Sequence, residues 1–239
     1  MNDKNQFQGL RCLIDLKLNK REYGIDLLRI LSMFMVVILH TLGNGGVLDN
    51  VKFGTANYYV AWFIEIASLC AINCYALISG YVLYKSSFKL SRIIKLWFQV
   101  FFYSVAITVI FFVVDGDSVS INDIIQSFMP VITKRYWYVT AYFGLFFFTP
   151  FLNKAIYSFD KMTAQKLITA VILLLSVLPM LTAYDLFMTN VGYSMLWLMA
   201  LYLIGAYIKK YDAFQSLKKG NLLLYCYLHN CSPNNKSCH

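Results

Sequence analysis

The chain has 239 residues, of which 59% are hydrophobic, 17% aromatic and only 14% charged, and its net charge is +9 at pH 7. Because soluble domains carry about 25% charged residues, this composition excludes a water-soluble globule. No basic face interleaved with exposed aromatic residues can be drawn on the sequence, so the positive charge does not indicate a nucleic-acid partner. The apolar residues come in blocks separated by short polar loops, which predicts an all-α, polytopic transmembrane helical bundle.

The segments at the two ends of the chain differ from the apolar blocks between them. Residues 1–20 are polar and charged and lack the apolar core of a signal peptide, so we expect a flexible cytoplasmic leader. Residues 21–211 contain the predicted spans, and residues 212–239 form an atypical tail. The cysteines and histidines of the tail match no zinc-ligand spacing, so no metal site is expected there.

Six blocks are long and apolar enough to cross a bilayer, which needs about 20 helical residues and accepts about 17. They are predicted at Ile25–Gly43, Tyr58–Tyr84, Ile93–Val114, Trp137–Leu152, Leu167–Tyr184 and Val191–Ile208. The fourth block is short and ends just after Pro150. Between the third and fourth blocks, Ile121–Ile132 is too short to span, and its mixed pattern predicts a helix lying in the membrane interface.

The lysines and arginines indicate the orientation of these spans, because translocating them across a membrane is unfavourable. One side collects sixteen of them: Lys4, Arg11, Lys17, Lys20, Arg21, Lys85, Lys89, Arg92, Lys95, Lys154, Lys161, Lys166, Lys209, Lys210, Lys218 and Lys219. The other side has only Lys52, Lys134 and Arg135. This difference predicts that the amino terminus is cytoplasmic.

The first block holds three ionisable residues, Asp26, Arg29 and His40, in the stretch YGIDLLRILSMFMVVILHT. Ionisable groups at membrane depth are costly and usually face a partner or a cavity. Arg29 and His40 are eleven residues apart, about 16 Å along a helix and within about 20° of the same face. Such a stripe suits a group that crosses the bilayer. The alternative is a local ion pair between Asp26 and Arg29, with His40 bonded to a neighbouring carbonyl.

The second block also contains polar and small residues. Glu65 is either a proton partner for His40 or a carboxylate used in helix packing or snorkelling. Ser79 and Gly80, in NCYALISGYVLY, are small enough to let two helices pack closely, without any other role.

Taken together, these residues resemble the membrane acyltransferase-3 family, whose members move acyl groups, often acetyl, onto sugars of cell-envelope glycans. The resemblance rests on Arg29 and His40 behind IDLLR, and on SGYVL, which contains Ser79, Gly80 and Tyr81. Three further stretches are similar to family segments and follow in the family order. They are the basic pair Arg92 and Lys95, WYVTAYFGLFFFTPFLN at Trp137–Asn153, and YSMLWLMALYLIGAYIKKY at Tyr193–Tyr211.

The resemblance implies an acyl-CoA co-substrate, acetyl-CoA above all, and an acceptor hydroxyl on a surface or exported polysaccharide. It also implies a place in the cytoplasmic membrane. On this reading Arg29, Arg92 and Lys95 bind the CoA phosphates, because they lie on the predicted cytoplasmic side. His40 is the general base or a transient acyl carrier, since histidine titrates near neutral pH. The resemblance implies nothing about the oligomeric state.

Supporting roles follow for three further residues. Asp26 holds Arg29 in place, and Trp137 and Tyr138 shape an acceptor or acyl pocket. For the two aromatic residues the alternative is membership of an interfacial belt.

Two features depart from the family pattern. Lys95 stands where the family has arginine, which keeps the charge but loses the bidentate fork for a phosphate. The family fold, carried over by analogy, has about ten helices, so six spans imply a truncated product. The alternatives to an active enzyme are a transporter or channel fragment, which would use the same Arg29 and His40 as a path, and an inactive membrane remnant.

Overall fold

The computed structural model describes residues 22–116, 119–133, 135–189 and 192–213, and within these ranges it contains helices and no strand. The predicted leader and all but the first two residues of the predicted tail lie outside the described residues. The chain divides into two compact units, Met1–Tyr75 and Ala76–His239.

Within the described residues, five helical stretches are long and apolar enough to cross a membrane. They are Tyr23–Asn44, Ala56–Leu83, Leu90–Val114, Trp137–Ser158 and Lys161–Thr182. The predicted class, an all-α polytopic helical bundle, is therefore confirmed.

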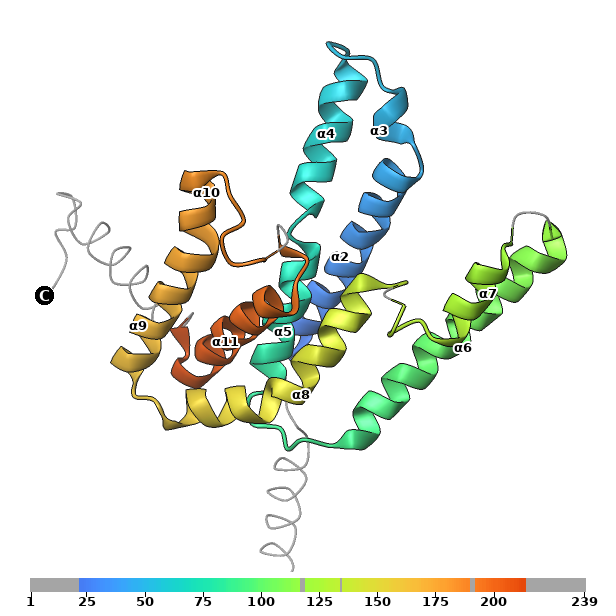
Figure 1. Ribbon diagram of the computed structural model, residues 1–239. Coiled ribbons are helices and arrows are strands. Elements are labelled where there is room, and N and C mark those ends of the chain that lie inside the picture. Colours follow the sequence, from blue (N-terminus) through green and yellow to red (C-terminus); the bar gives the residue numbers. More distant parts are fainter. Residues whose placement is uncertain (1–21, 117–118, 134, 190–191, 214–239) are drawn as a thin grey trace, which may run out of the picture. The chain divides into compact units, whose positions relative to one another are not determined.

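The first unit is a helical hairpin. Helix α2 (Tyr23–Leu39) continues into a π-helical turn, η1 (His40–Asn44), and a short α3 (Val47–Asn50) leads to α4 (Ala56–Ser68). Helices α2 and α4 lie side by side, as Figure 1 shows in blue and cyan. The turn before α3 needs the left-handed backbone of Gly46, whose φ is +74°.

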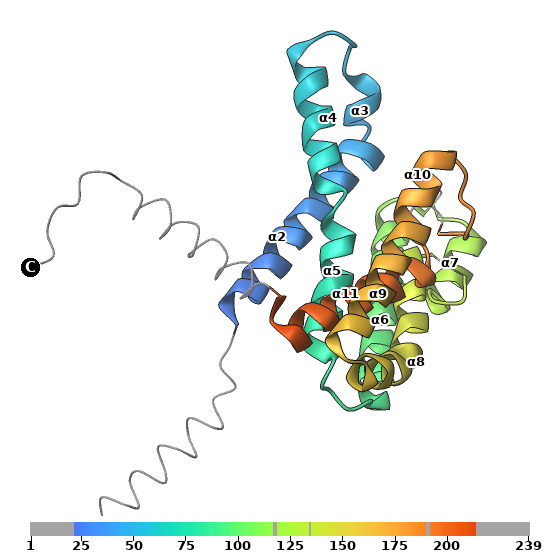
Figure 2. The same cartoon turned by 90° about the vertical axis from the view of Figure 1, so that its left-hand side faces the viewer.

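The second unit begins within α5 (Ala71–Leu83) and contains the remaining helices. They are α6 (Leu90–Val114), α7 (Ile121–Phe128), α8 (Trp137–Ser158), α9 (Lys161–Ile172), η3 (Leu173–Val177), α10 (Leu178–Thr182) and α11 (Met195–Tyr211). Helix α9, the π turn η3 and α10 form one continuous rod, which both views show in orange (Figures 1 and 2). Helix α11 lies against α8 and α9. Helix α7 begins at Ile121, where the interfacial helix was predicted to begin, and ends at Phe128 rather than at Ile132.

Helix α8 corrects the predicted fourth span, which ended at Leu152. The helix passes through Pro150 and ends at Ser158. Proline has no N–H and cannot bond the carbonyl four residues before it, here that of Phe146. The hydroxyl of Thr149 donates to this carbonyl at 2.7 Å, so the oxygen is satisfied and the helix continues.

The predicted sixth span is represented by α11, which begins later than Val191 and ends later than Ile208. Its first residue is set by Ser194, whose hydroxyl accepts a hydrogen bond from the Trp197 N–H at 3.3 Å. Helix α11 has 17 residues, so it is shorter than the five spans above and about 26 Å long. Six of its residues are buried, which makes it a central element of the second unit: Leu198, Ala200, Leu201, Tyr202, Gly205 and Ala206.

Two contacts fix α11 in the second unit. A Cβ on Gly205 would lie only 2.0 Å from the carbonyl oxygen of Leu77, so α5 and α11 cross with their backbones in contact. At the end of α11, the Lys210 ammonium donates to the carbonyl oxygens of Ile156, Tyr157 and Phe159 at 2.8, 3.0 and 2.6 Å. These carbonyls belong to the carboxyl end of α8, where a cation also opposes the helix dipole.

Candidate functional site

The first unit brings together two of the predicted site residues, Asp26 and Arg29. Their side chains form an ion pair of 3.1 Å on α2, as the alternative interpretation of this pair expected. The carbonyl oxygen of Arg29 also accepts a hydrogen bond from the Tyr75 hydroxyl at 3.1 Å, so the backbone is held at this point. Both partners of the ion pair remain accessible, and Asp26 therefore orients the guanidinium without covering it.

His40 is the first residue of the π turn that extends α2. Its Nδ1 lies 2.9 Å from the carbonyl oxygen of Val36. Because a carbonyl oxygen can only accept, Nδ1 is the donor in this bond, which in a neutral ring leaves the lone pair on Nε2. The bond to a neighbouring carbonyl was also expected on the alternative interpretation, yet it leaves the ring in the tautomer that a general base needs. Helix α2 contains Arg29 and ends at Leu39, and the backbone of His40 is still right-handed helical, so the eleven-residue spacing places Arg29 and His40 on one helix face.

Glu65 lies on α4, against the π turn. Its Oε1 would be 3.9 Å from a Cβ on Gly43, and its Oε2 is buried and has no hydrogen-bond partner among the described residues. A buried carboxylate oxygen without a donor is unfavourable, and such groups are often found where a ligand or a proton arrives. The absence of a side chain at Gly43 lets the carboxylate lie against the turn that begins with His40.

Arg92 and Lys95 lie one turn apart at the start of α6, and both are exposed. The guanidinium of Arg92 donates to the hydroxyl of Ser86, in the loop that precedes α6. This bond, together with the hydrogen bond from the Arg92 backbone N–H to the Lys89 carbonyl oxygen at 2.9 Å, holds Arg92 beside the loop.

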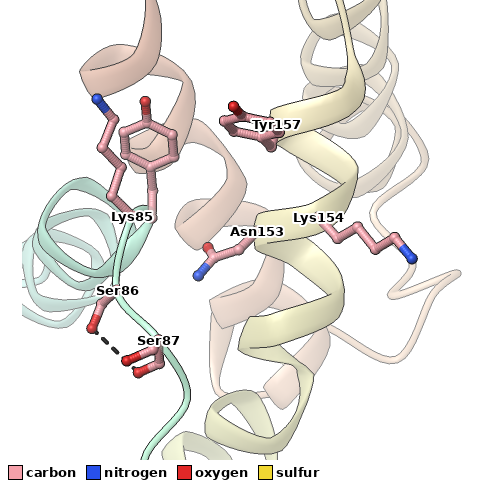
Figure 3. Close-up of a pocket in the computed structure, with 7 residues that line it drawn as sticks. Lys85, Ser86, Ser87, Asn153, Lys154 and Tyr157 are labelled. Carbon is pink, nitrogen blue, oxygen red and sulfur yellow. Dashed lines mark hydrogen bonds between the residues drawn. The ribbon is translucent and has the colours of Figure 1, made fainter.

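The Ser86 loop forms one wall of a pocket of about 590 Å³. The lining residues are Tyr84, Lys85, Ser86, Ser87, Asn153, Lys154 and Tyr157. Figure 3 shows that Asn153 and Tyr157 point from α8 toward the loop, whereas the side chain of Lys154 points away from it. With Lys85 and the neighbouring Arg92 supplying cations, and hydroxyl and amide groups supplying hydrogen bonds, the pocket suits an anionic ligand.

One residue that lines the pocket also belongs to the buried core of the second unit. Tyr84, which lines it, is also part of a buried cluster with Ile156, Ala164 and Ala206. Tyr84 is therefore held in place by residues of α8, α9 and α11.

The SGYVL residues of α5 lie at the α11 crossing. Gly80 lies against the α11 backbone, which supports the packing interpretation of this segment. The Tyr81 hydroxyl accepts a hydrogen bond from Lys209 at 3.3 Å, and the same ammonium lies 4.4 Å from the centre of the Tyr81 ring. Ser79 directly precedes Gly80 on the same helix.

Trp137 and Tyr138 are the first two residues of α8. The Trp137 ring meets the Tyr193 ring edge to face at 4.6 Å, and the Tyr138 ring is stacked with that of Tyr142 at 6.0 Å. The helix start therefore carries a small aromatic cluster, an arrangement that fits both a pocket wall and an interfacial belt.

Sequence reasoning did not find the pocket residues. Lys85 and Lys154 were used only to orient the spans, and Asn153 was only the last residue of a family-like segment. A usable signal was present, since KSS and NK each follow a predicted span on the same predicted side of the membrane. Residues 83 and 153 are 70 positions apart, and only the packing of α5 and α8 brings them together.

The fold defines the class of the protein as a multi-pass helical membrane protein. The chain matches the model of the acyltransferase family 3, described as an acyltransferase domain, over residues 22–228. The match covers most of the chain, and the chain therefore belongs to the acyltransferase-3 family. No curated protein and no solved structure gives a significant match.

Membership of this family makes the chain an acyltransferase that transfers groups other than aminoacyl groups. It acts in a lipid bilayer and requires an acyl donor and an acceptor. The matched region includes every predicted site residue from Asp26 to Tyr138.

Proposed function

We propose that the chain transfers an acyl group, with acetyl as the expected group, from acyl-CoA across the cytoplasmic membrane to a hydroxyl of a surface or exported polysaccharide. The observation that carries this proposal is the state of His40. Its Nδ1–H is bonded to Val36, its Nε2 is left as a base, and it lies eleven residues beyond Arg29 on one helix.

The donor enters from the predicted cytoplasmic side. The CoA phosphates need cations, and Arg29, Arg92 and Lys95 are all assigned to that side by the charge distribution. The pocket beside Arg92 adds Lys85 and the Asn153 amide, so we assign the phosphates to this pocket and its rim. Asp26 keeps the Arg29 guanidinium in place through the 3.1 Å ion pair.

His40 carries the chemical step. Its Nε2 takes the proton of the acceptor hydroxyl while the hydroxyl oxygen bonds to the thioester carbonyl carbon. The carbon–sulfur bond then breaks, and the leaving thiolate takes the proton from the imidazolium, which yields the ester and free CoA. In the alternative route, Nε2 itself attacks the thioester carbonyl carbon, and the carbon–sulfur bond breaks to release the CoA thiolate. The acceptor hydroxyl then attacks the acyl-imidazole, the carbon–nitrogen bond breaks, and the hydroxyl proton passes to the thiolate, which yields the same ester and free CoA.

Other residues support this step without taking part in it. The Glu65 carboxylate, against the turn that begins with His40, stabilises the positive charge of the imidazolium. Ser79, Gly80 and Tyr81 set the approach of α5 and α11, beside the donor pocket. Trp137 and Tyr138, at the start of α8, form an acceptor or acyl surface.

Labelled acetyl-CoA tests the proposal with the full chain in its native membranes. The wild-type chain should transfer label to polysaccharide, and His40→Ala should lose at least about 100-fold of that rate, because general base catalysis contributes about 100- to 10,000-fold. Thr41→Ala is the matched control, since Thr41 also bonds back to a helix carbonyl but has no assigned role. Label retained on His40 identifies the acyl-carrier route.

Two outcomes would contradict the proposal. Transfer by His40→Ala at the wild-type rate removes the catalytic assignment. Wild-type membranes that transport a solute and transfer no acyl group favour the transporter alternative.

A further inference from the structure

One hydrogen-bond network joins α11 to the donor pocket. Tyr202 is completely buried, and its hydroxyl donates to the Oδ1 of Asn153 at 2.8 Å. The Nδ2 of Asn153 in turn donates to the carbonyl oxygen of Leu83 at 3.1 Å. Leu83 is the last residue of α5, directly before the loop that forms the pocket wall.

This network determines which end of the Asn153 amide faces the pocket. The amide oxygen is taken by Tyr202, and one hydrogen of Nδ2 is taken by Leu83. The second Nδ2 hydrogen is left for the pocket, toward which Asn153 points in Figure 3. An amide turned the other way would present its oxygen to an anion and repel it.

We propose that Tyr202 is a positioning residue for the acyl donor. Through Asn153 it fixes an N–H donor in the pocket for a phosphate oxygen of the donor, and through Leu83 it holds the start of the Lys85–Ser87 loop. This inference rests on the proposed function, because it takes the pocket to be the donor site. It differs from a packing role, in which the Tyr202 hydroxyl would only satisfy itself against Asn153.

A double-mutant cycle separates the two roles. Equilibrium binding of labelled acetyl-CoA is measured with the purified full chain in lipid nanodiscs, where no turnover is needed. Tyr202→Phe removes only the hydroxyl and should weaken binding about 3- to 10-fold, the value of one hydrogen bond. In an Asn153→Ala background the same change should alter binding by less than about twofold, since the partner is gone.

Two further variants complete the experiment. Tyr207→Phe, on the same helix and outside the network, is the matched control and should bind acetyl-CoA as the wild type does. Asn153→Asp keeps an acceptor for Tyr202 but loses the N–H and adds a negative charge, so it should bind more weakly than Asn153→Ala. This variant tests the pocket even if Tyr202→Phe fails to fold.

The outcomes distinguish this inference from the proposed function. A wild-type chain that binds no acetyl-CoA overturns the donor pocket and the positioning role together. Wild-type binding with equal losses from Tyr202→Phe in both backgrounds overturns the positioning role alone. The same conclusion follows if Asn153→Asp binds as tightly as Asn153→Ala.

Discussion

Gly80 of α5 lies so close to Tyr202 of α11 that a Cβ on Gly80 would be 2.0 Å from the Tyr202 carbonyl oxygen. Gly205 makes the reciprocal contact with the α5 backbone. The two glycines thus form the crossing point of the helices, and each is needed because the neighbouring atom is backbone and cannot turn aside. The small residue in SGYVL has a structural reason that is independent of acyl transfer.

This crossing predicts that Gly80→Ala lowers the free energy of unfolding by about 1–3 kcal/mol, the usual cost of overpacking. The measurement is reversible unfolding in mixed detergent micelles. Gly24→Ala is the matched control, because nothing lies within 4 Å of a Cβ there. That variant should be neutral or more stable by up to about 1 kcal/mol, since alanine favours a helix. Equal stability of Gly80→Ala and wild type would show that the helices do not cross so closely.

The hydrogen bond of the Thr149 hydroxyl predicts that removing this hydroxyl destabilises the chain only while Pro150 is present. Thr149→Val leaves the Phe146 carbonyl without a donor and should destabilise the chain by about 1–3 kcal/mol. Thr149→Ser keeps the hydroxyl and should be close to wild type. In a Pro150→Ala background the new N–H can bond Phe146, so Thr149→Val should then cost little. The same loss in both backgrounds would contradict this account.

The basic pair at the start of α6 predicts the direction of changes in donor affinity. Lys95→Arg should tighten acetyl-CoA binding about threefold, because a guanidinium can hold a phosphate through two bonds. Arg92→Lys should weaken binding by a similar factor. Lys166→Arg on α9 is a control of the same chemistry at a position with no assigned role. Unchanged affinity in both α6 variants would remove these residues from the donor site.

The hydrogen bonds of Asp160 predict that the folded chain becomes less stable in acid. It caps α9, and hydrogen bonds from Thr163, with smaller contributions from the Met162 N–H, hold the pKa of its carboxyl below the ordinary value. Because the pKa is lower in the folded chain than in the unfolded chain, the ionised carboxylate stabilises the fold at pH values above about 3.9, the ordinary pKa of aspartate. This stabilisation is lost as the pH falls through the pKa of the folded chain.

Asp160→Ala should therefore be less stable than wild type at neutral pH, and the difference should shrink in acid. Asp160→Asn keeps a capping oxygen that does not titrate, so its own stability should lack this acid-dependent loss. Unfolding measured between pH 7 and pH 3 gives the comparison. A difference between wild type and Asp160→Ala that is independent of pH would rule out the titration of Asp160 as its source.

Much of the fold could be predicted because the bilayer demands long apolar stretches, and these are visible in the sequence. The first and third spans begin and end within three residues of their predicted limits. The end of α8 could not be predicted in the same way, because Pro150 normally indicates a helix end. The hydroxyl that satisfies the Phe146 carbonyl comes from a single neighbouring residue, Thr149, and the periodicity of apolar residues does not reveal it.

Part of the candidate site could likewise be predicted from the sequence, and part of it could not. The Asp26–Arg29 pair follows from a spacing of three residues on one helix, so the sequence was sufficient. The donor pocket depends on Asn153 meeting the end of α5 across 70 residues, and the His40 tautomer depends on one bond to Val36. Neither contact leaves a periodic pattern of residues in the sequence, because each arises from helix packing or from the choice of a side-chain rotamer.

Lys210 completes the carboxyl end of α8, although it follows that end by more than fifty residues. Because α8 precedes Lys210 in the chain, it is synthesised first, and until α11 follows, the carbonyl oxygens of Ile156, Tyr157 and Phe159 need water or lipid headgroups as partners. Arrival of α11 replaces those temporary partners with a single ammonium. The hydrogen bonding at the carboxyl end of α8 is therefore complete only once α11 is in place.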